Sequence, residues 1–217
     1  MVTEQWERWA TFGAVLFVGL IVVAVVLTID TPSGDASPEE WVSFYDDSGN
    51  RQGFITGGFI VFLAGALFLW WLGALRSVLG RIQPGGAPLA ALVIYGGLVG
   101  LVLQLAGTAA GSAYPGAVEF FDDFGGDGQL AMLFASLSFW VTTMANVGGT
   151  VMAGALAAIV LRTGLFPRWF GWVSVVVAAT QLAGAVVPFV GLLFLPWVLT
   201  LALLMLRRPV PAGASVD

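Results

Sequence analysis

Long apolar runs alternate with short polar segments along this chain. Four runs, 10–29, 54–75, 88–112 and 134–161, are each near or above the roughly 20 residues with which a helix crosses a bilayer. Residues 169–206 form one more apolar stretch, broken by Pro188 and Gly191. We interpret it as two spans, 169–187 and 190–206, joined by a tight turn, and a re-entrant hairpin is the competing interpretation.

This pattern predicts an all-α fold, a polytopic transmembrane helix bundle of six spans that forms a single domain over residues 1–206. A disordered cytoplasmic tail is expected at 207–217, where proline, alanine and glycine follow one another without periodicity. The first apolar run exceeds the roughly 7–15 residues of a signal-peptide core and lacks a small-residue cleavage site, so we expect a retained first span.

The distribution of charge predicts the orientation. Hydrophobic residues make up 59% of the chain and charged ones 10%, whereas a soluble domain is about a quarter charged. The arginines gather in the segments on one side, namely Arg8, Arg76, Arg81, Arg162, Arg168, Arg207 and Arg208. Most acidic residues and Arg51 fall on the other. Because basic residues favour the cytoplasmic face, we expect both termini in the cytoplasm and a multi-pass protein of the plasma membrane.

Several classes of chemistry are excluded by the residues that the chain lacks. It has no Cys, His or Lys, so His-ligated haem, a thiolate metal site, a lysine Schiff base and a Ser-His-Asp triad are impossible. The apolar runs hold no charged residue, which removes the usual signs of ion coupling. We therefore expect no enzymatic centre, no cofactor and no metal; the outer acids, such as Asp46, Asp122 and Asp127, do not follow the calcium-loop pattern.

The first outer loop contains a helix-start signal. Ser37-Pro38-Glu39-Glu40 is a capping box with proline at the first helical position, which predicts a short helix that ends near Gly49. Its aromatic residues, Trp41, Phe44 and Tyr45, share one face. That face is expected to lie on the membrane surface or over the helix bundle.

Glycines in G-x-x-x-G spacing mark the second and third spans. The pairs are Gly53 and Gly57, Gly96 and Gly100, and Gly107 and Gly111. This spacing lets two helix backbones approach closely, and it favours packing within the chain, with contact between copies of a homo-oligomer as the alternative.

Uncharged polar residues inside the spans are the candidate binding residues. The fourth span holds Thr143, Asn146 and Thr150 on one helical face, and Gln104 and Gln181 lie at mid-depth in the third and fifth spans. An amide is unfavourable in lipid and should point into the bundle. There these five residues either join the helices or line a site for a small neutral ligand, such as one bearing a carbonyl, hydroxyl or quinone oxygen.

Two motifs carry a resemblance to a known group of proteins. The first runs from Ser37-Pro38-Glu39-Glu40-Trp41 through Phe44-Tyr45 to Asn50-Arg51, and the second from Leu161-Arg162-Thr163-Gly164 through Pro167-Arg168-Trp169 to Gly171-Trp172. In both, the chain resembles a domain-of-unknown-function family of bacterial six-span integral membrane proteins that is common in GC-rich genomes. The resemblance implies the six-span layout and supplies no catalytic or binding residues.

These observations lead to a non-enzymatic structural or accessory module as the first functional hypothesis. Its expected partners are membrane lipids and a membrane protein or a second copy of the chain, and not nucleic acid. The alternative is a permease or binder for a small neutral or apolar ligand, held by the mid-membrane polar cluster. A membrane enzyme that acts through the outer acids is the remaining hypothesis.

Overall fold

The computed structural model describes residues 2–81, 87–121, 124, 126–184 and 188–207, and the regular elements of this part of the chain are all helices. They are α1 (Val2–Leu27), α2 (Pro38–Asp46), α3 (Ser48–Gly80), α4 (Ala87–Phe120), α5 (Gly128–Thr163), α6 (Arg168–Ala183), the 3-10 helix η2 (Pro188–Leu193) and α7 (Phe194–Leu206). The prediction of an all-α helical bundle is confirmed. The tail at 208–217 and Asp122 lie outside the described residues.

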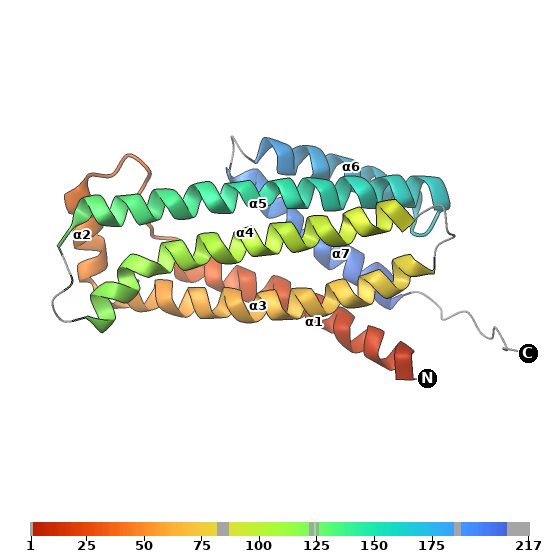
Figure 1. The fold of residues 1–217 in the computed structure, drawn as a ribbon, viewed down its shortest axis with the longest axis horizontal. Helices are drawn as coiled ribbons and strands as arrows, with labels where there is room; N and C mark the ends of the chain where they lie inside the picture. Colours follow the sequence, from red (N-terminus) through yellow and green to blue (C-terminus); the bar gives the residue numbers. More distant parts are fainter. Residues whose placement is uncertain (1, 82–86, 122–123, 125, 185–187, 208–217) are drawn as a thin grey trace, which may run out of the picture.

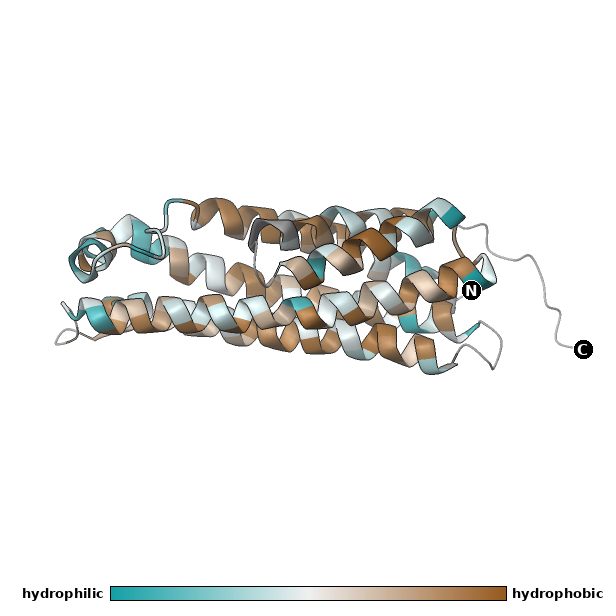
Figure 2. Cartoon of the chain, turned by 90° about the horizontal axis from the view of Figure 1, so that it is seen from above, coloured by the Kyte–Doolittle hydropathy of each residue, from teal (hydrophilic) through white to brown (hydrophobic). Residues whose placement is uncertain are grey.

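Four helices, α1, α3, α4 and α5, are long and apolar enough to cross a membrane. They lie alongside one another, and α2 crosses one end of the bundle (Figure 1). Apolar residues dominate the middle of these helices and polar residues gather toward the two ends (Figure 2). Large apolar side chains such as Leu133 and Trp140 are exposed on the outside of the bundle, as a surface that faces lipid requires.

The helices pack in a ring that the C-terminal hairpin completes. α1 packs on α3, α3 on α4, and α4 on α5, while α6 packs on α5 and α7 on α1. The hairpin of α6 and α7 thus occupies the gap between α1 and α5. Trp71, Met152 and Trp197 are among the fully buried side chains of the core that results.

The two helices of the C-terminal hairpin, α6 and α7, are shorter than the four long helices α1, α3, α4 and α5. α6 has 16 residues and α7 has 13, below the roughly 20 needed to span a bilayer. A Cβ atom at Gly149, near the middle of α5, would lie 2.8 Å from Oε1 of Gln181 in the last turn of α6, and one at Gly191 would lie 3.1 Å from Oδ1 of Asn146. The hairpin therefore turns back at half depth (Figure 1). This agrees with the competing interpretation of a re-entrant hairpin, and the fifth and sixth full spans stay a prediction.

One hydrogen bond and a ring stack join the two helices of this hairpin, and a second hydrogen bond, within α6, orients the shared hydroxyl. The Trp197 indole N–H donates to the Ser174 hydroxyl at 2.9 Å, and that hydroxyl donates to the carbonyl of Phe170 at 2.8 Å. The rings of Phe170 and Trp197 stack with their centroids 6.0 Å apart. The turn before α6 follows its motif, because Gly164 ends α5 in the left-handed conformation (φ 66°) that glycine tolerates best.

The predicted capping box forms at the start of α2. Ser37 accepts a hydrogen bond from the backbone N–H of Glu40, and the Glu40 carboxylate accepts one from the N–H of Ser37. The helix ends at Asp46 rather than near Gly49, because the Asp47 carboxylate caps the next helix, α3. The predicted aromatic face packs over the bundle, where Trp41 and Tyr45 are buried.

The glycine stripes bring helices of the same chain together. A Cβ atom added to Gly96 would lie 2.8 Å from the Gly148 carbonyl oxygen, and one added to Gly107 would lie 2.9 Å from the Thr142 nitrogen. A Cβ atom at Gly53 would meet the Leu27 carbonyl oxygen of α1 at 2.9 Å. The interpretation as intrachain packing is confirmed for these contacts, since backbones this close leave no room for a side chain.

Candidate binding cavity

A cavity of about 410 Å³ lies in the middle of the bundle. Residues of α1, α3, α4, α5, α6, η2 and α7 line it, so it forms where the tip of the half-depth hairpin meets the long helices. Its volume falls within the range of about 300–1,000 Å³ that is typical of small-molecule sites. The cavity is partly open rather than sealed.

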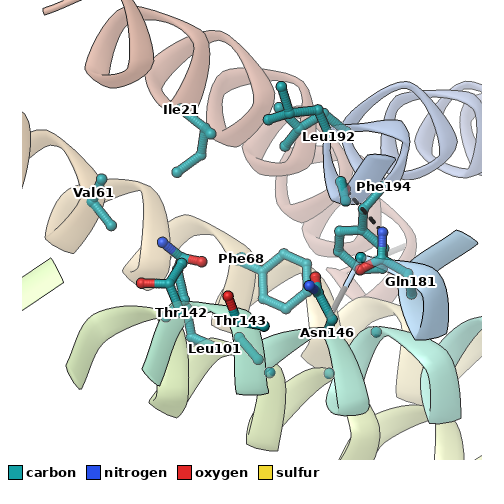
Figure 3. A pocket seen from close by; sticks show the side chains of 18 of the residues that line it. Ile21, Val61, Phe68, Leu101, Thr142, Thr143, Asn146, Gln181, Leu192 and Phe194 are labelled. Carbon is teal, nitrogen blue, oxygen red and sulfur yellow. Dashed lines mark hydrogen bonds between the residues drawn. The ribbon is translucent and has the colours of Figure 1, made fainter. Parts of the chain in front are cut away.

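Four of the five candidate binding residues line this cavity: Gln104, Thr143, Asn146 and Gln181. They come from α4, α5 and α6, and the side chains of Thr143, Asn146 and Gln181 lie around one space (Figure 3). Thr150 does not line the cavity; its hydroxyl donates to the Asn146 carbonyl oxygen at 2.9 Å within α5. The structure thus brings four of the five predicted residues together at one cavity and leaves Thr150 outside it, while their role in binding a ligand stays a prediction.

The polar groups of the cavity are only partly satisfied by the protein. The Gln181 amide donates to the Gly191 carbonyl oxygen at 2.8 Å. Within the described part of the chain, the side chains of Gln104, Thr143 and Asn146 make no hydrogen bond. The polar atoms of these three side chains are not fully buried, since Trp71 Nε1 is the buried side-chain nitrogen or oxygen without a partner among the described residues. In largely apolar surroundings, unpaired amide and hydroxyl groups still favour an occupant that offers donors and acceptors.

The rest of the lining is apolar and uncharged. Phe17 and Ile21 of α1, Val61 and Phe68 of α3, and Leu101 of α4 contribute to the wall (Figure 3). None of the described lining residues is Asp, Glu, Arg, Lys or His. A charged group inside would find no counter-charge in this lining, so the chemistry of the cavity suits a neutral molecule.

The sequence missed the residues that give the cavity its room. Gly149, Gly184 and Gly191 line it, and the absence of side chains there leaves space beside the polar groups. Gly149 lies within the polar stretch from Thr143 to Thr150 of the fourth span, so its position was a usable signal. No sequence signal indicated that Phe17 and Ile21 of α1 would line the cavity, because both lie in an apolar run whose middle has no polar residue to distinguish one face.

Several of the described outer acids take structural roles at the α2 end. The Arg51 guanidinium donates to the Glu119 carboxylate at 2.8 Å and to the carbonyl oxygen of Tyr45 at 2.7 Å, which joins α2, α3 and α4. Asp47 caps α3 and Asp127 caps α5. Among the described residues, no three acidic, histidine or cysteine side chains gather as a metal site would require.

Comparison of the chain with models of known protein families, with curated proteins and with solved structures gave no match. The resemblance to a six-span family therefore stays a prediction. The geometry of the cavity is the basis on which a function can be assigned.

Proposed function

We propose that this protein is a non-enzymatic membrane module that binds a neutral, largely apolar ligand carrying a carbonyl or hydroxyl oxygen. One observation carries the proposal: three side chains with unpaired hydrogen-bonding groups, Gln104, Thr143 and Asn146, line one apolar cavity of about 410 Å³. Polar side chains in such surroundings are expected to be satisfied, and a ligand oxygen would satisfy them.

The chemistry of these groups selects the ligand. The two amides each offer a donor and an acceptor, and the threonine hydroxyl offers both, so a carbonyl or a hydroxyl can bind without a change of charge. A carboxylate or an ammonium would lose its hydration without gaining a counter-ion from the described lining. The ligand is therefore uncharged, with a small polar part and a larger apolar part.

An accessory role remains compatible with this proposal, because a lipid is one such ligand. A protein partner is less well supported by the described residues. The glycine pairs that could have joined two copies are occupied by contacts between α4 and α5 and between α1 and α3. The polar cluster points into the cavity rather than to the outer surface.

The proposal includes a place in the plasma membrane, with both termini in the cytoplasm. Its support is the charge pattern, since α1 begins and α7 ends at the end of the bundle opposite α2 (Figure 1), where six described arginines lie. The chain has no cysteine, so single-cysteine variants give clean reports. Ser43→Cys, exposed on α2, should react with a membrane-impermeant maleimide in intact cells, whereas Ser77→Cys, exposed near the end of α3, should react only after lysis. The reverse pattern would contradict this orientation.

The ligand itself is tested by native mass spectrometry of protein extracted gently from its own membrane. The wild type should carry a discrete small-molecule adduct, and Asn146→Leu should lose it while its melting temperature stays close to that of the wild type. Thr150→Val is the matched control: it also removes a polar group from α5, but one that bonds to the backbone of its own helix and lies outside the cavity lining. That variant should keep the adduct.

Two results would refute the proposal. If the protein carries no adduct in any preparation, the proposal that it binds a ligand is refuted. If Asn146→Leu keeps the adduct, the proposal that the ligand binds at Asn146 is refuted. If Asn146→Leu only lowers the melting temperature, the polar cluster joins helices and binds nothing.

A further inference from the structure

A second cavity, of about 200 Å³, adjoins the first between α1, α3, α4 and α5. On each of these helices, its lining lies farther toward the α2 end than the lining of the first cavity. Five residues line both cavities: Ile21, Val25, Val61, Gln104 and Thr142. The two cavities are therefore neighbouring parts of one tract.

The second cavity has unpaired polar groups of its own. Thr108 of α4 and Ser138 of α5 line it and do not line the first cavity. Within the described part of the chain, neither hydroxyl makes a hydrogen bond and neither oxygen is fully enclosed by protein. The hydroxyls of Thr28, Ser112 and Thr142 already donate to backbone carbonyl oxygens. Thr108 and Ser138 are thus the hydroxyls that most need a partner from an occupant.

The polar lining of the tract comes mainly from α4 and α5. Every fourth residue is polar on both helices: Gln104, Thr108 and Ser112 on α4, and Ser138, Thr142 and Asn146 on α5. Residues at this spacing lie on one face of a helix, and at 1.5 Å per residue each series extends over about 12 Å. Because α4 and α5 pack closely along their length, the two series form one polar wall that runs past both cavities.

The wall that α1 and α3 contribute is apolar. Apart from glycines, its residues within the two helices are Phe17, Ile21, Ala24, Val25, Phe54, Val61 and Phe68. Thr28, which follows α1, is polar, but its hydroxyl donates to the Ala24 carbonyl oxygen at 3.1 Å. Figure 3 shows Ile21 on one side of the first cavity and Thr142 and Thr143 on the other. The tract therefore has a polar side and an apolar side along its length.

We infer that the ligand carries two separated, uncharged oxygens, hydroxyl or carbonyl, on one edge and hydrocarbon on the opposite edge. Gln104, Thr143 and Asn146 bind the first oxygen, and Thr108 and Ser138 bind the second. None of the residues that line the second cavity is charged, so the second oxygen is neutral like the first.

The helix positions set the spacing of the two oxygens. Thr108 lies four residues from Gln104 on α4, and Ser138 lies eight residues from Asn146 on α5. These separations correspond to about 6 Å and about 12 Å along the tract. The inference rests on the proposed function, because the first oxygen is held by the same polar side chains. It adds a second binding position and a spacing that the ligand must match.

The test uses the full chain in lipid nanodiscs with three eight-carbon probes. The terminal diol is octanediol with a hydroxyl at each end, the vicinal diol is octanediol with hydroxyls on neighbouring carbons, and octanol has one hydroxyl. Binding is measured by isothermal titration calorimetry, with empty nanodiscs as the blank for partition into lipid. The wild type should bind the terminal diol about tenfold more tightly than octanol, which corresponds to about one net hydrogen bond.

A double variant, Thr108→Val with Ser138→Ala, removes the second binding position. Its affinity for the terminal diol should fall about tenfold, to that for octanol, while its affinities for octanol and for the vicinal diol stay at wild-type values. The matched control is Thr150→Val with Ser136→Ala, because neither residue lines a cavity and Ser136 is exposed on α5. This control should bind all three probes as the wild type does. If the double variant does not fold, Ser138→Ala alone should still weaken binding of the terminal diol.

The failure of this inference can be told from the failure of the proposed function. The second position is overturned if the wild type binds the terminal diol no better than octanol, if it binds none of the probes, or if the double variant weakens both diols equally. In each case a native adduct that Asn146→Leu loses would still support the proposed function. If Asn146→Leu binds every probe as the wild type does, the proposed function itself is wrong.

Discussion

Replacing Gly148 with alanine should separate the two helices that pack most extensively in this bundle, α4 and α5. A Cβ atom at Gly148 would lie 2.3 Å from the backbone nitrogen of Gly100 and 2.5 Å from the carbonyl oxygen of Gly96. All of these neighbours are backbone atoms in the middle of a helix, so no side chain can rotate away to make room.

The magnitude follows from this geometry. Ordinary contacts of a Cβ atom begin near 3.4 Å, so the two backbones must move apart by about 1 Å at this crossing. Overpacking a core typically costs about 1–3 kcal/mol, and a rigid backbone neighbour places this substitution at the upper end. For a chain of this size, about 3 kcal/mol corresponds to a fall in melting temperature of about 6–12 °C.

Thermal unfolding in a mild detergent, followed by circular dichroism, measures the effect. Gly154→Ala is the matched control in the same helix, because its Cβ atom would meet only Ala178 at 3.8 Å, an ordinary contact. Alanine is also the better helix former, so this variant should melt at or slightly above the wild-type temperature. If Gly148→Ala and Gly154→Ala melt together, the close approach of α4 and α5 is refuted.

Three further predictions concern single contacts. Arg51→Gln removes the ion pair with Glu119, in which the Arg51 side chain is 18% exposed and the Glu119 side chain 27%. This variant should lower the free energy of unfolding by about 1–2 kcal/mol. Because the pair is partly buried, high salt should not abolish the difference in melting temperature from the wild type. Ser174→Ala leaves the buried Trp197 indole N–H without its acceptor and should cost about 1–3 kcal/mol in the same assay, whereas an unchanged melting temperature would contradict the hydrogen bond. Burial raises the pKa of Tyr45 above 10.0, its ordinary value, so above that pH the unfolded chain loses a proton that the folded protein keeps, and stability falls as the pH rises. Tyr45→Phe should reduce this alkaline loss in melts at a series of pH values, and equal losses in both proteins would contradict it.

The sequence predicted well those features that arise from local patterns. The first four apolar runs became helices α1, α3, α4 and α5 because length and hydropathy decide such segments directly. The capping box at Ser37 formed as expected, since its hydrogen bonds join residues only three positions apart. The helices extend past the apolar runs. For example, α5 begins at Gly128 rather than at 134, because the Asp127 carboxylate caps the helix there and stabilises a first turn that hydropathy alone does not reveal.

Features that depend on the relative placement of helices were beyond the sequence. The polarity of Asn146 and Gln181 indicated a position inside the bundle, and both line the cavity. Nothing in the pattern showed that Thr150, one turn along the same face, would bond to its own helix instead. The depth of the hairpin was equally hidden, because an apolar stretch of this length suits two short spans as well as a re-entrant turn, and only contacts such as that of Gln181 with Gly149 distinguish them.

The short hairpin and the glycines act together to make the cavity. Had α6 and α7 continued to the α2 end, they would have filled the gap between α1 and α5 along its whole length, as they do on the other half of the bundle. Gly96 and Gly100 face both the backbone of α5 and the cavity, so they hold α4 against α5 and at the same time leave space in front of the polar side chains. Larger residues at Gly96 and Gly100 would both force α4 and α5 apart and occupy part of the cavity. The residues that stabilise the fold and those that make room for a ligand are therefore partly the same, and the binding of a ligand is best tested at Asn146, which leaves these helix contacts intact.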